Sequence, residues 1–173
     1  KRPPHGENFF PERMVFMAKL LIAYFSKSGT TRARAEQIAR VTGGDLFEIA
    51  PEVPYTRVDL EWTNKQSRST IEMNDPACRP AIAGTVDDMG SYSTVFVGFP
   101  IWWYREPSII DTFLEAYDFS NATVVPFCTS GGSGTGSIDE RFRDVCATAA
   151  GFRPARLLNG AREAEIKRWV EGL

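Results

Sequence analysis

The sequence predicts an α/β fold in which a parallel sheet lies between two layers of helices. Two observations support this class: short apolar segments alternate with amphipathic segments from Lys19 onward, and clusters of glycine, serine or threonine separate them. Strands that alternate with helices form right-handed βαβ units, which build a doubly wound sheet. The chain has 173 residues, enough for one such domain with a sizeable core.

The first half of the domain is expected to begin strand, helix, strand. The apolar run 19–25 predicts a strand, and 45–49 predicts the next. Between them we expect a helix over 31–42, which the glycine pair 43–44 ends. Its buried face recurs at helical spacing and consists of Ala35, Ile38, Ala39 and Thr42.

The middle of the chain gives the weakest pattern. Residues 50–92 contain a candidate helix from Leu60 to Met73, but its periodicity is poor. A strand follows at 94–99, and Glu106-Pro107 opens a helix because proline is favoured in a first helical turn. The core face of that helix is expected to consist of Ile110, Phe113, Leu114 and Tyr117.

The last part continues the alternation. We expect a strand at 122–128, and Ser137-Ile138-Asp139-Glu140 has the pattern of a capping box that starts a helix. Gly151 is expected to end this helix, and a short strand at 156–158 follows. The helix positions expected to be buried are Ile138, Phe142, Val145 and Ala149, and a final amphipathic helix carries Ile166, Trp169, Val170 and Leu173.

Residues 1–18 are interpreted as an arm or extension that precedes the domain at 19–173. Lys1-Arg2-Pro3-Pro4 is charged and proline-rich, unlike a secretory signal, and the segment has no periodicity. Its apolar residues either dock on the domain or join a neighbouring subunit as a homodimer contact; these are Phe9, Phe10, Val15 and Phe16.

Composition excludes several functional classes. The net charge of −2 gives no electrostatic case for nucleic acid or an anionic membrane, and no apolar run is long enough to span a bilayer. The three cysteines, Cys78, Cys128 and Cys146, have no metal-binding spacing, and their odd number predicts a reducing, cytoplasmic location. The single histidine, His5, lies in the arm, so histidine base chemistry in the domain is excluded.

The segment after the first strand carries four hydroxyl groups around one glycine. Ser26, Ser28, Thr30 and Thr31 surround Gly29 where the next helix begins. A helix N-terminus offers unpaired N–H groups and partial positive charge, so this loop suits a phosphate dianion. A capped helix after a turn is the alternative. The loop matches neither GxxxxGK(S/T) nor GxGxxG, which disfavours nucleoside triphosphates and dinucleotides.

Three aromatic residues in a row follow the strand at 94–99. Pro100 and Ile101 lead into Trp102, Trp103 and Tyr104. Consecutive side chains point in different directions, so core packing does not account for all three, and at least one is expected to face a flat ligand ring. A hydrophobic loop or a subunit interface is the alternative.

A glycine-rich loop follows the strand at 122–128. Thr129, Ser130, Gly131, Gly132 and Ser133 lie there, and glycine lets backbone groups approach a ligand without a Cβ clash. Ligands of open parallel sheets bind beyond the carboxyl ends of the strands. The three loops together therefore predict a mononucleotide with an aromatic ring, with FMN as the first choice.

These residues resemble the flavodoxin-like family of FMN proteins over residues 19–173. The resemblance implies a three-layer sandwich with a five-stranded parallel sheet of order 2-1-3-4-5, of the short-chain type. It also implies that the first loop holds the FMN phosphate, the second stacks on the ring and the third closes over its edge. The family motifs are S-x-S/T-G-x-T, matched by Ser26, Ser28, Gly29 and Thr31; P-I-W-W, matched by Pro100, Ile101, Trp102 and Trp103; and T-x-G-G-S-G, matched by Thr129, Gly131, Gly132, Ser133 and Gly134.

Three functions remain open at this point. The first is an FMN protein that passes electrons to an unidentified redox protein, with no catalytic side chain and no metal. The second is an FMN-dependent NAD(P)H oxidoreductase that reduces a quinone or similar acceptor, because fold alone does not separate the two. The third is a module without flavin whose aromatic loop binds a partner. The sequence departs from many relatives at Tyr104, where they have glycine, and in its nearly neutral charge.

Overall fold

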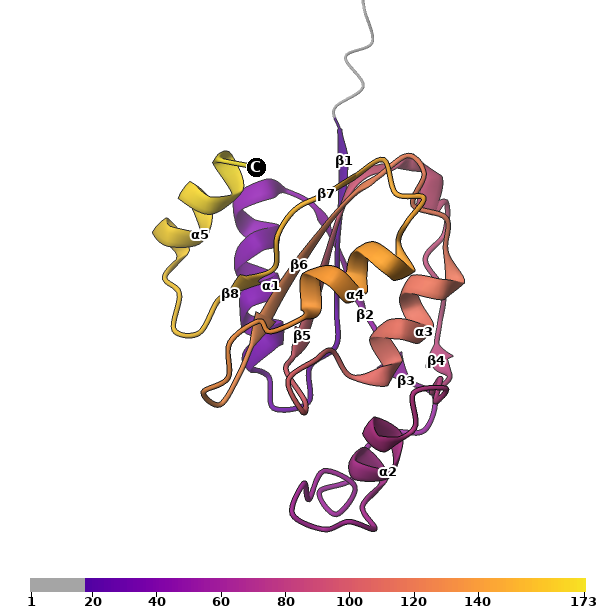
Figure 1. Cartoon of the computed structure of the whole chain (residues 1–173). Helices are drawn as coiled ribbons and strands as arrows, with labels where there is room; N and C mark the ends of the chain where they lie inside the picture. Colours follow the sequence, from indigo (N-terminus) through magenta and orange to yellow (C-terminus); the bar gives the residue numbers. More distant parts are fainter. Residues whose placement is uncertain (1–17) are drawn as a thin grey trace, which may run out of the picture.

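The computed structural model describes residues 18–173, which form three layers around a central parallel sheet (Figure 1). The strands are β1 (Lys19–Tyr24), β2 (Asp45–Glu48), β5 (Tyr92–Pro100), β6 (Thr123–Thr129), β7 (Gly151–Phe152) and β8 (Arg156–Leu157). Their order is β2-β1-β5-β6-β7, and β8 also pairs with β6. This confirms the expected order 2-1-3-4-5, with the fifth position shared by two short strands.

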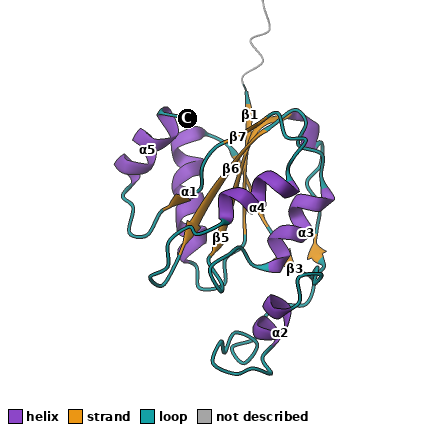
Figure 2. Ribbon diagram, in the orientation of Figure 1, coloured by secondary structure: helices purple, strands orange, loops and turns teal. Residues whose placement is uncertain are grey.

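Two helices cover each face of the sheet (Figure 2). On one side α1 (Thr30–Thr42) and α5 (Glu163–Glu171) bury Ile38 and Ile166 against β1, β5 and β6. On the other side α3 (Ser108–Ala116) and α4 (Ile138–Val145) bury Phe113 and Phe142 in the larger core. The apolar faces expected from helical spacing therefore point to the sheet, except that Leu173 lies beyond the end of α5 and is exposed.

The helix ends agree with the sequence in one case and differ in another. Gly43 caps α1 with a left-handed φ of 70°, as expected for a glycine at this position. Ser137 precedes α4, but its side chain makes no capping hydrogen bond, so the predicted capping box is wrong. Helix α4 also ends at Val145 rather than at Gly151. The Asp139 carboxylate instead accepts a hydrogen bond from the Ala155 N–H at 2.7 Å.

Most of the segment with poor periodicity, residues 50–92, lies outside the three-layer sandwich. Strands β3 (Ala50–Pro51) and β4 (Ile82–Ala83) pair antiparallel at its base, and residues 52–81 extend beyond the sheet as a unit we call the cap. The cap contains only one helix, α2 (Arg68–Asn74), so the helix expected from Leu60 is wrong in its first half. A short 3-10 turn, η1 (Met89–Ser91), then leads back into β5.

The cap lies beyond the carboxyl ends of the strands (Figure 1), where the three predicted loops also lie. Close packing of the two central strands depends on one glycine. A Cβ at Gly98 in β5 would lie 2.1 Å from Cζ of Phe127 in β6, which is far inside contact distance. The predicted arm and its proposed dimer contact lie outside the described residues, apart from Ala18.

Candidate functional site

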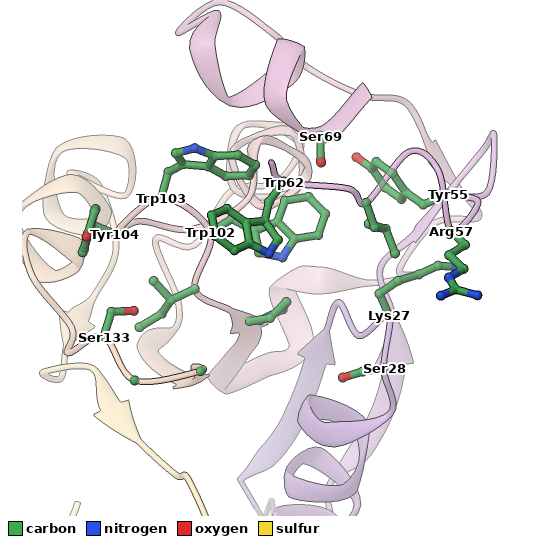
Figure 3. Close-up of a pocket in the computed structure, with 15 residues that line it drawn as sticks. Lys27, Ser28, Tyr55, Arg57, Trp62, Ser69, Trp102, Trp103, Tyr104 and Ser133 are labelled. Atoms are coloured by element: carbon green, nitrogen blue, oxygen red, sulfur yellow. The ribbon is translucent and has the colours of Figure 1, made fainter. Parts of the chain in front are cut away.

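A cavity of about 870 Å³ opens at the carboxyl ends of the strands, between the loops and the cap (Figure 3). Cavities of about 300–1,000 Å³ are typical of small-molecule sites. The residues that line it are Lys27, Ser28, Tyr55, Arg57, Leu60, Trp62, Ser69, Pro100, Ile101, Trp102, Trp103, Tyr104, Gly131, Gly132 and Ser133.

The three predicted loops converge on this cavity, although not with every residue. The predicted residues in its lining are Ser28, Pro100, Ile101, Trp102, Trp103, Tyr104, Gly131, Gly132 and Ser133. The predicted residues outside the lining are Ser26, Gly29, Thr30, Thr31, Thr129 and Ser130. The sequence did not indicate Lys27 or the cap residues Tyr55, Arg57, Leu60, Trp62 and Ser69. Their only signal was a group of aromatic residues in a polar segment without periodicity.

The hydroxyl-rich loop wraps around the N-terminus of α1. Gly29 has a left-handed φ of 89°, and its N–H donates to Ser26 Oγ at 3.2 Å. The first helical bond runs from the Ala33 N–H to the Gly29 carbonyl at 3.0 Å. The N–H groups of Thr30 and Thr31 precede that bond and have no intrahelical acceptor. The loop therefore presents backbone and hydroxyl donors, and its one basic side chain, that of Lys27, also lines the cavity.

The side chain of Thr31 joins two of the loops at their bases. Its hydroxyl lies 2.8 Å from the hydroxyl of Thr129, and both residues are buried. A hydroxyl can donate one hydrogen bond and accept others, so this pair satisfies two buried polar groups. Thr31 and Thr129 therefore fix the hydroxyl-rich loop relative to the glycine loop.

The aromatic loop is a tight two-residue turn. Trp102 and Arg105 exchange two backbone hydrogen bonds of 2.9 and 3.1 Å, with Trp103 and Tyr104 between them. These two residues have positive φ values of 46° and 65°. Left-handed backbone costs a residue with a side chain about 1–2 kcal/mol, so the fold holds this turn against a local preference.

The three aromatic side chains of this turn differ in surroundings. Trp102 packs edge-to-face against Phe25 and Tyr55, with ring centroids 5.4 and 5.6 Å apart. Trp103 is 39% exposed and Tyr104 is 76% exposed. Trp102 therefore supports the inner wall of the cavity, whereas Trp103 and Tyr104 remain open at its mouth (Figure 3).

The glycine-rich loop is held by its own polar side chains. Ser130 N–H donates to Asn159 Oδ1 at 2.8 Å, and Ser130 Oγ donates to the Ser133 carbonyl at 2.6 Å. A Cβ added at Gly131 or Gly132 would meet no atom within 4 Å. Both glycines line the cavity, so no side chain of theirs keeps a ligand away from the backbone of the loop.

A buried cluster of charged residues lies directly behind the aromatic turn. The carboxyl groups of Glu106 and Asp111 are almost fully buried, and they share the guanidinium groups of Arg105 and Arg141. Arg141 Nε lies 2.7 Å from Glu106 Oε1. Among the described residues, Glu106 Oε2 and Asp111 Oδ1 have no hydrogen-bond partner. Burial, and then the neighbouring Asp111 carboxyl, raise the pKa of Glu106 to about 7.

The cysteines make no part of the cavity. All three are free, and Cys128 and Cys146 are buried, as expected for small apolar side chains. Cys78 is half-buried, and burial and the nearby carboxylates of Glu72 and Asp75 raise the pKa of its thiol. This environment disfavours a reactive thiol at Cys78, because the thiolate is the nucleophilic form.

Residues 18–173 contain neither a metal-binding cluster nor a membrane-spanning helix. No cluster of three or more histidine, cysteine, aspartate or glutamate side chains has the arrangement of a metal site. No helix in this part of the chain has the length and apolarity needed to cross a membrane.

Comparison with known proteins adds to this geometry. The flavodoxin family model matches residues 19–173, which is nearly the whole described chain. The chain belongs to the flavodoxin family. Comparison with curated proteins gave no match.

Two solved structures from Bacteroides resemble this flavodoxin family member closely. A candidate flavoprotein from Bacteroides eggerthii DSM 20697 is 46% identical, with a TM-score of 0.85 over 90% of this chain and 98% of that chain. One from Bacteroides uniformis ATCC 8492 is 40% identical, with a TM-score of 0.85 over 89% and 98%. A flavoprotein from Lactobacillus acidophilus NCFM, solved in complex with FMN, shares the fold at 23% identity, with a TM-score of 0.68 over 89% and 99%.

Proposed function

We propose that the protein binds one FMN in this cavity and passes electrons through it. The observation that carries the proposal is the convergence of a hydroxyl-rich loop, an aromatic turn and a glycine loop on one cavity in a flavodoxin family member. The FMN complex of the Lactobacillus acidophilus protein, which has the same fold, supports the choice of this flavin.

The hydroxyl-rich loop is the proposed phosphate site. The hydroxyls of Ser26, Ser28 and Thr30 and the first N–H groups of α1 would donate hydrogen bonds to the phosphate, whose charge suits a helix N-terminus. Thr31 would act through its bond to Thr129, which holds this loop in place. The Arg32 guanidinium pairs with the Glu48 carboxylate at 2.7 Å, so we do not assign it to the phosphate.

The aromatic turn and the glycine loop are the proposed ring site. Trp103 would stack on the flavin ring, and Trp102 would back the cavity wall through its contacts with Phe25 and Tyr55. Backbone groups of Gly131 and Gly132 would meet the polar edge of the ring. When bound, the flavin supplies the redox chemistry, and the side chains orient it and shield it from water.

Electron transfer to a redox protein needs an accessible edge of the site. The exposed side chains of Trp103 and Tyr104 at the cavity mouth support such access. A second candidate function is FMN-dependent NAD(P)H oxidoreductase activity on a quinone or similar acceptor. The cap favours it, since it encloses the cavity on a side that the three loops leave open and creates room for a small molecule.

The flavin proposal is tested by binding measurements on purified, flavin-free protein. FMN should bind about one to one and more tightly than riboflavin or FAD, because the site has a single phosphate loop without a dinucleotide motif. The reconstituted protein should absorb near ~370 and ~450 nm, the usual flavin bands. Riboflavin binding as tight as FMN binding would contradict the phosphate site.

Anaerobic mixing separates the two functions. The FMN-loaded protein is mixed with NADH or NADPH, and benzoquinone is then added as acceptor. Electron carriage predicts slow bleaching by either nucleotide and fast reduction by a partner reductase. Bleaching followed by sustained turnover at about 1–1,000 per second would instead establish the oxidoreductase.

We also propose a location and an assembly for the protein. The three free cysteines support a reducing compartment such as the cytoplasm. A homodimer through the N-terminal arm concerns residues outside the described part of the chain, and size-exclusion chromatography of the full and arm-deleted proteins would test it.

A further inference from the structure

The cap forms a wall of the cavity that the three FMN loops do not provide. Tyr55, Arg57, Leu60, Trp62 and Ser69 line the cavity from this side (Figure 3). Under the proposed function, the three loops already supply sites for the phosphate, the ring face and the ring edge of one mononucleotide. The cap residues are therefore available to a second ligand beside the flavin.

The cap wall is held firmly in position. Tyr55 is buried and donates a hydrogen bond to Glu72 of α2, whose other carboxylate oxygen lies 2.7 Å from Arg68 Nε. The Arg68 guanidinium lies 4.0 Å from the centre of the Tyr55 ring, and that ring also packs against Trp102. These contacts fix the Tyr55 part of the cap wall before any ligand binds, which lowers the entropy cost of binding there.

The charge of the lining is entirely positive. Lys27 and Arg57 are its only charged residues, and neither makes an ion pair with any residue in the 18–173 range. Two carboxylates follow Arg57 in the same segment, those of Asp59 and Glu61, and both lie outside the lining; Asp59 accepts two hydrogen bonds from Thr56. A cleft with charge of one sign attracts ligands of the opposite sign.

Aromatic side chains surround the same opening. Trp62 of the cap is 73% exposed, and Trp103 and Tyr104 are exposed on the aromatic turn. Single exposed apolar side chains are common, but three large rings from two separate segments at one cavity mouth form a patch that marks a ligand site. Their flat faces suit a planar aromatic ring.

We infer that the cap and the aromatic turn form a second subsite for a planar aromatic electron acceptor that carries an acidic group, such as a sulfonate or carboxylate. Trp62 stacks on the acceptor ring, and the Arg57 guanidinium binds the acidic group as a fork. The subsite rests on the proposed FMN site and on the second candidate function, the reduction of a small acceptor, because the acceptor lies beside the bound FMN. The cavity has a volume of about 870 Å³, near the upper end of the usual range for small-molecule sites, so it offers space beside the flavin ring.

The test uses the FMN-loaded protein and two probes that flavin does not reduce. Naphthalene-2-sulfonate is charged, and naphthalene-2-sulfonamide is its neutral analogue of the same shape. Binding is measured from the change in the flavin absorbance spectrum and from tryptophan fluorescence. We expect the sulfonate to bind about tenfold more tightly, the factor of roughly one additional charge-assisted hydrogen bond.

Three variants assign the effect to residues. Arg57→Gln should abolish most of the preference for the sulfonate, and Trp62→Ala should weaken both probes equally. Lys65→Gln is the matched control, because it removes one exposed positive charge from the same cap outside the cavity lining. It should leave both affinities unchanged.

Several results would overturn the inference. Equal affinity for the two probes would remove the acidic-group subsite. A loss of FMN affinity without a loss of riboflavin affinity in Arg57→Gln would assign Arg57 to the flavin phosphate. Probe binding only to the flavin-free protein would place the probe in the ring site. Failure of the protein to load FMN at all would refute the proposed function itself, and it is detected before any probe is added.

Discussion

The buried pair of carboxyl groups behind the aromatic turn makes a prediction about stability and pH. The perturbation is Glu106→Gln, which removes a titrating group but keeps its shape. The Glu106 side chain is 1% exposed, and its Oε2 and the Oδ1 of Asp111 both lack partners among the described residues. A protonated Glu106, or a glutamine, can donate the hydrogen bond that two carboxylates cannot make.

The direction in which stability changes with pH follows from the direction of the Glu106 pKa shift. Burial and the Asp111 carboxyl raise the pKa of Glu106 from 4.5 to about 7, against the opposing effect of Arg141. The folded state therefore prefers the protonated form, and this contribution to stability is complete below pH 4.5 and disappears as the pH rises through 7. At about 1.4 kcal/mol per pKa unit, the whole effect amounts to about 3.5 kcal/mol, of which about 2.5 kcal/mol falls between pH 5 and pH 8.

The assay is urea-induced unfolding of wild type and Glu106→Gln at pH 5, 6, 7 and 8, at a fixed flavin content. The free energy of unfolding of the wild type, minus that of the variant, should fall by about 2.5 kcal/mol over this range. Glu140→Gln, an exposed glutamate on α4, is the control and should track the wild type. A difference between wild type and Glu106→Gln that does not change with pH would refute the reasoning.

Three further predictions concern the loops and the sheet. Ser28→Ala should weaken FMN binding by roughly 1–2 kcal/mol and leave riboflavin binding nearly unchanged, as measured by flavin fluorescence titration; equal losses would indicate an effect on folding. Trp103→Ala should reduce the quenching of tryptophan fluorescence by FMN and shift the reduction potential, whereas an unchanged potential would place the ring elsewhere. Gly98→Ala should destabilise the fold by about 1–3 kcal/mol in urea unfolding, since the Phe127 ring must move; wild-type stability would contradict this packing argument.

The sequence by itself determined the layers of the fold and the end of the sheet at which ligands bind. Apolar runs and helical spacing depend on neighbouring residues, so they identified β1, α1, β5 and β6 without tertiary information. Parallel strands all have their carboxyl ends at one edge, so the segments after three of them had to meet there. For that reason the hydroxyl-rich, aromatic and glycine loops were predicted together, and the cavity lies between them.

Some local patterns gave no reliable answer. The residues around Ser137 fit a capping box, yet Asp139 instead binds the Ala155 N–H, a contact with a residue far along the chain. In the cap, only the second half of the expected helix formed, and Arg68 and Glu72 of α2 bind the Val53 carbonyl and the Tyr55 hydroxyl of the preceding segment. Local propensity is a weak prior where long-range contacts offer the same groups better partners.

Only the tertiary structure decided the orientation of the side chains within the site. Trp102 turns inward because Phe25 and Tyr55, from two other segments, enclose its ring, while Trp103 remains at the mouth. Thr31 turns toward Thr129 because both hydroxyls are buried and need a partner. The cap adds Arg57 and Trp62 to the lining. Its position depends on contacts between residues distant in sequence, which the spacing of apolar residues along the chain does not predict.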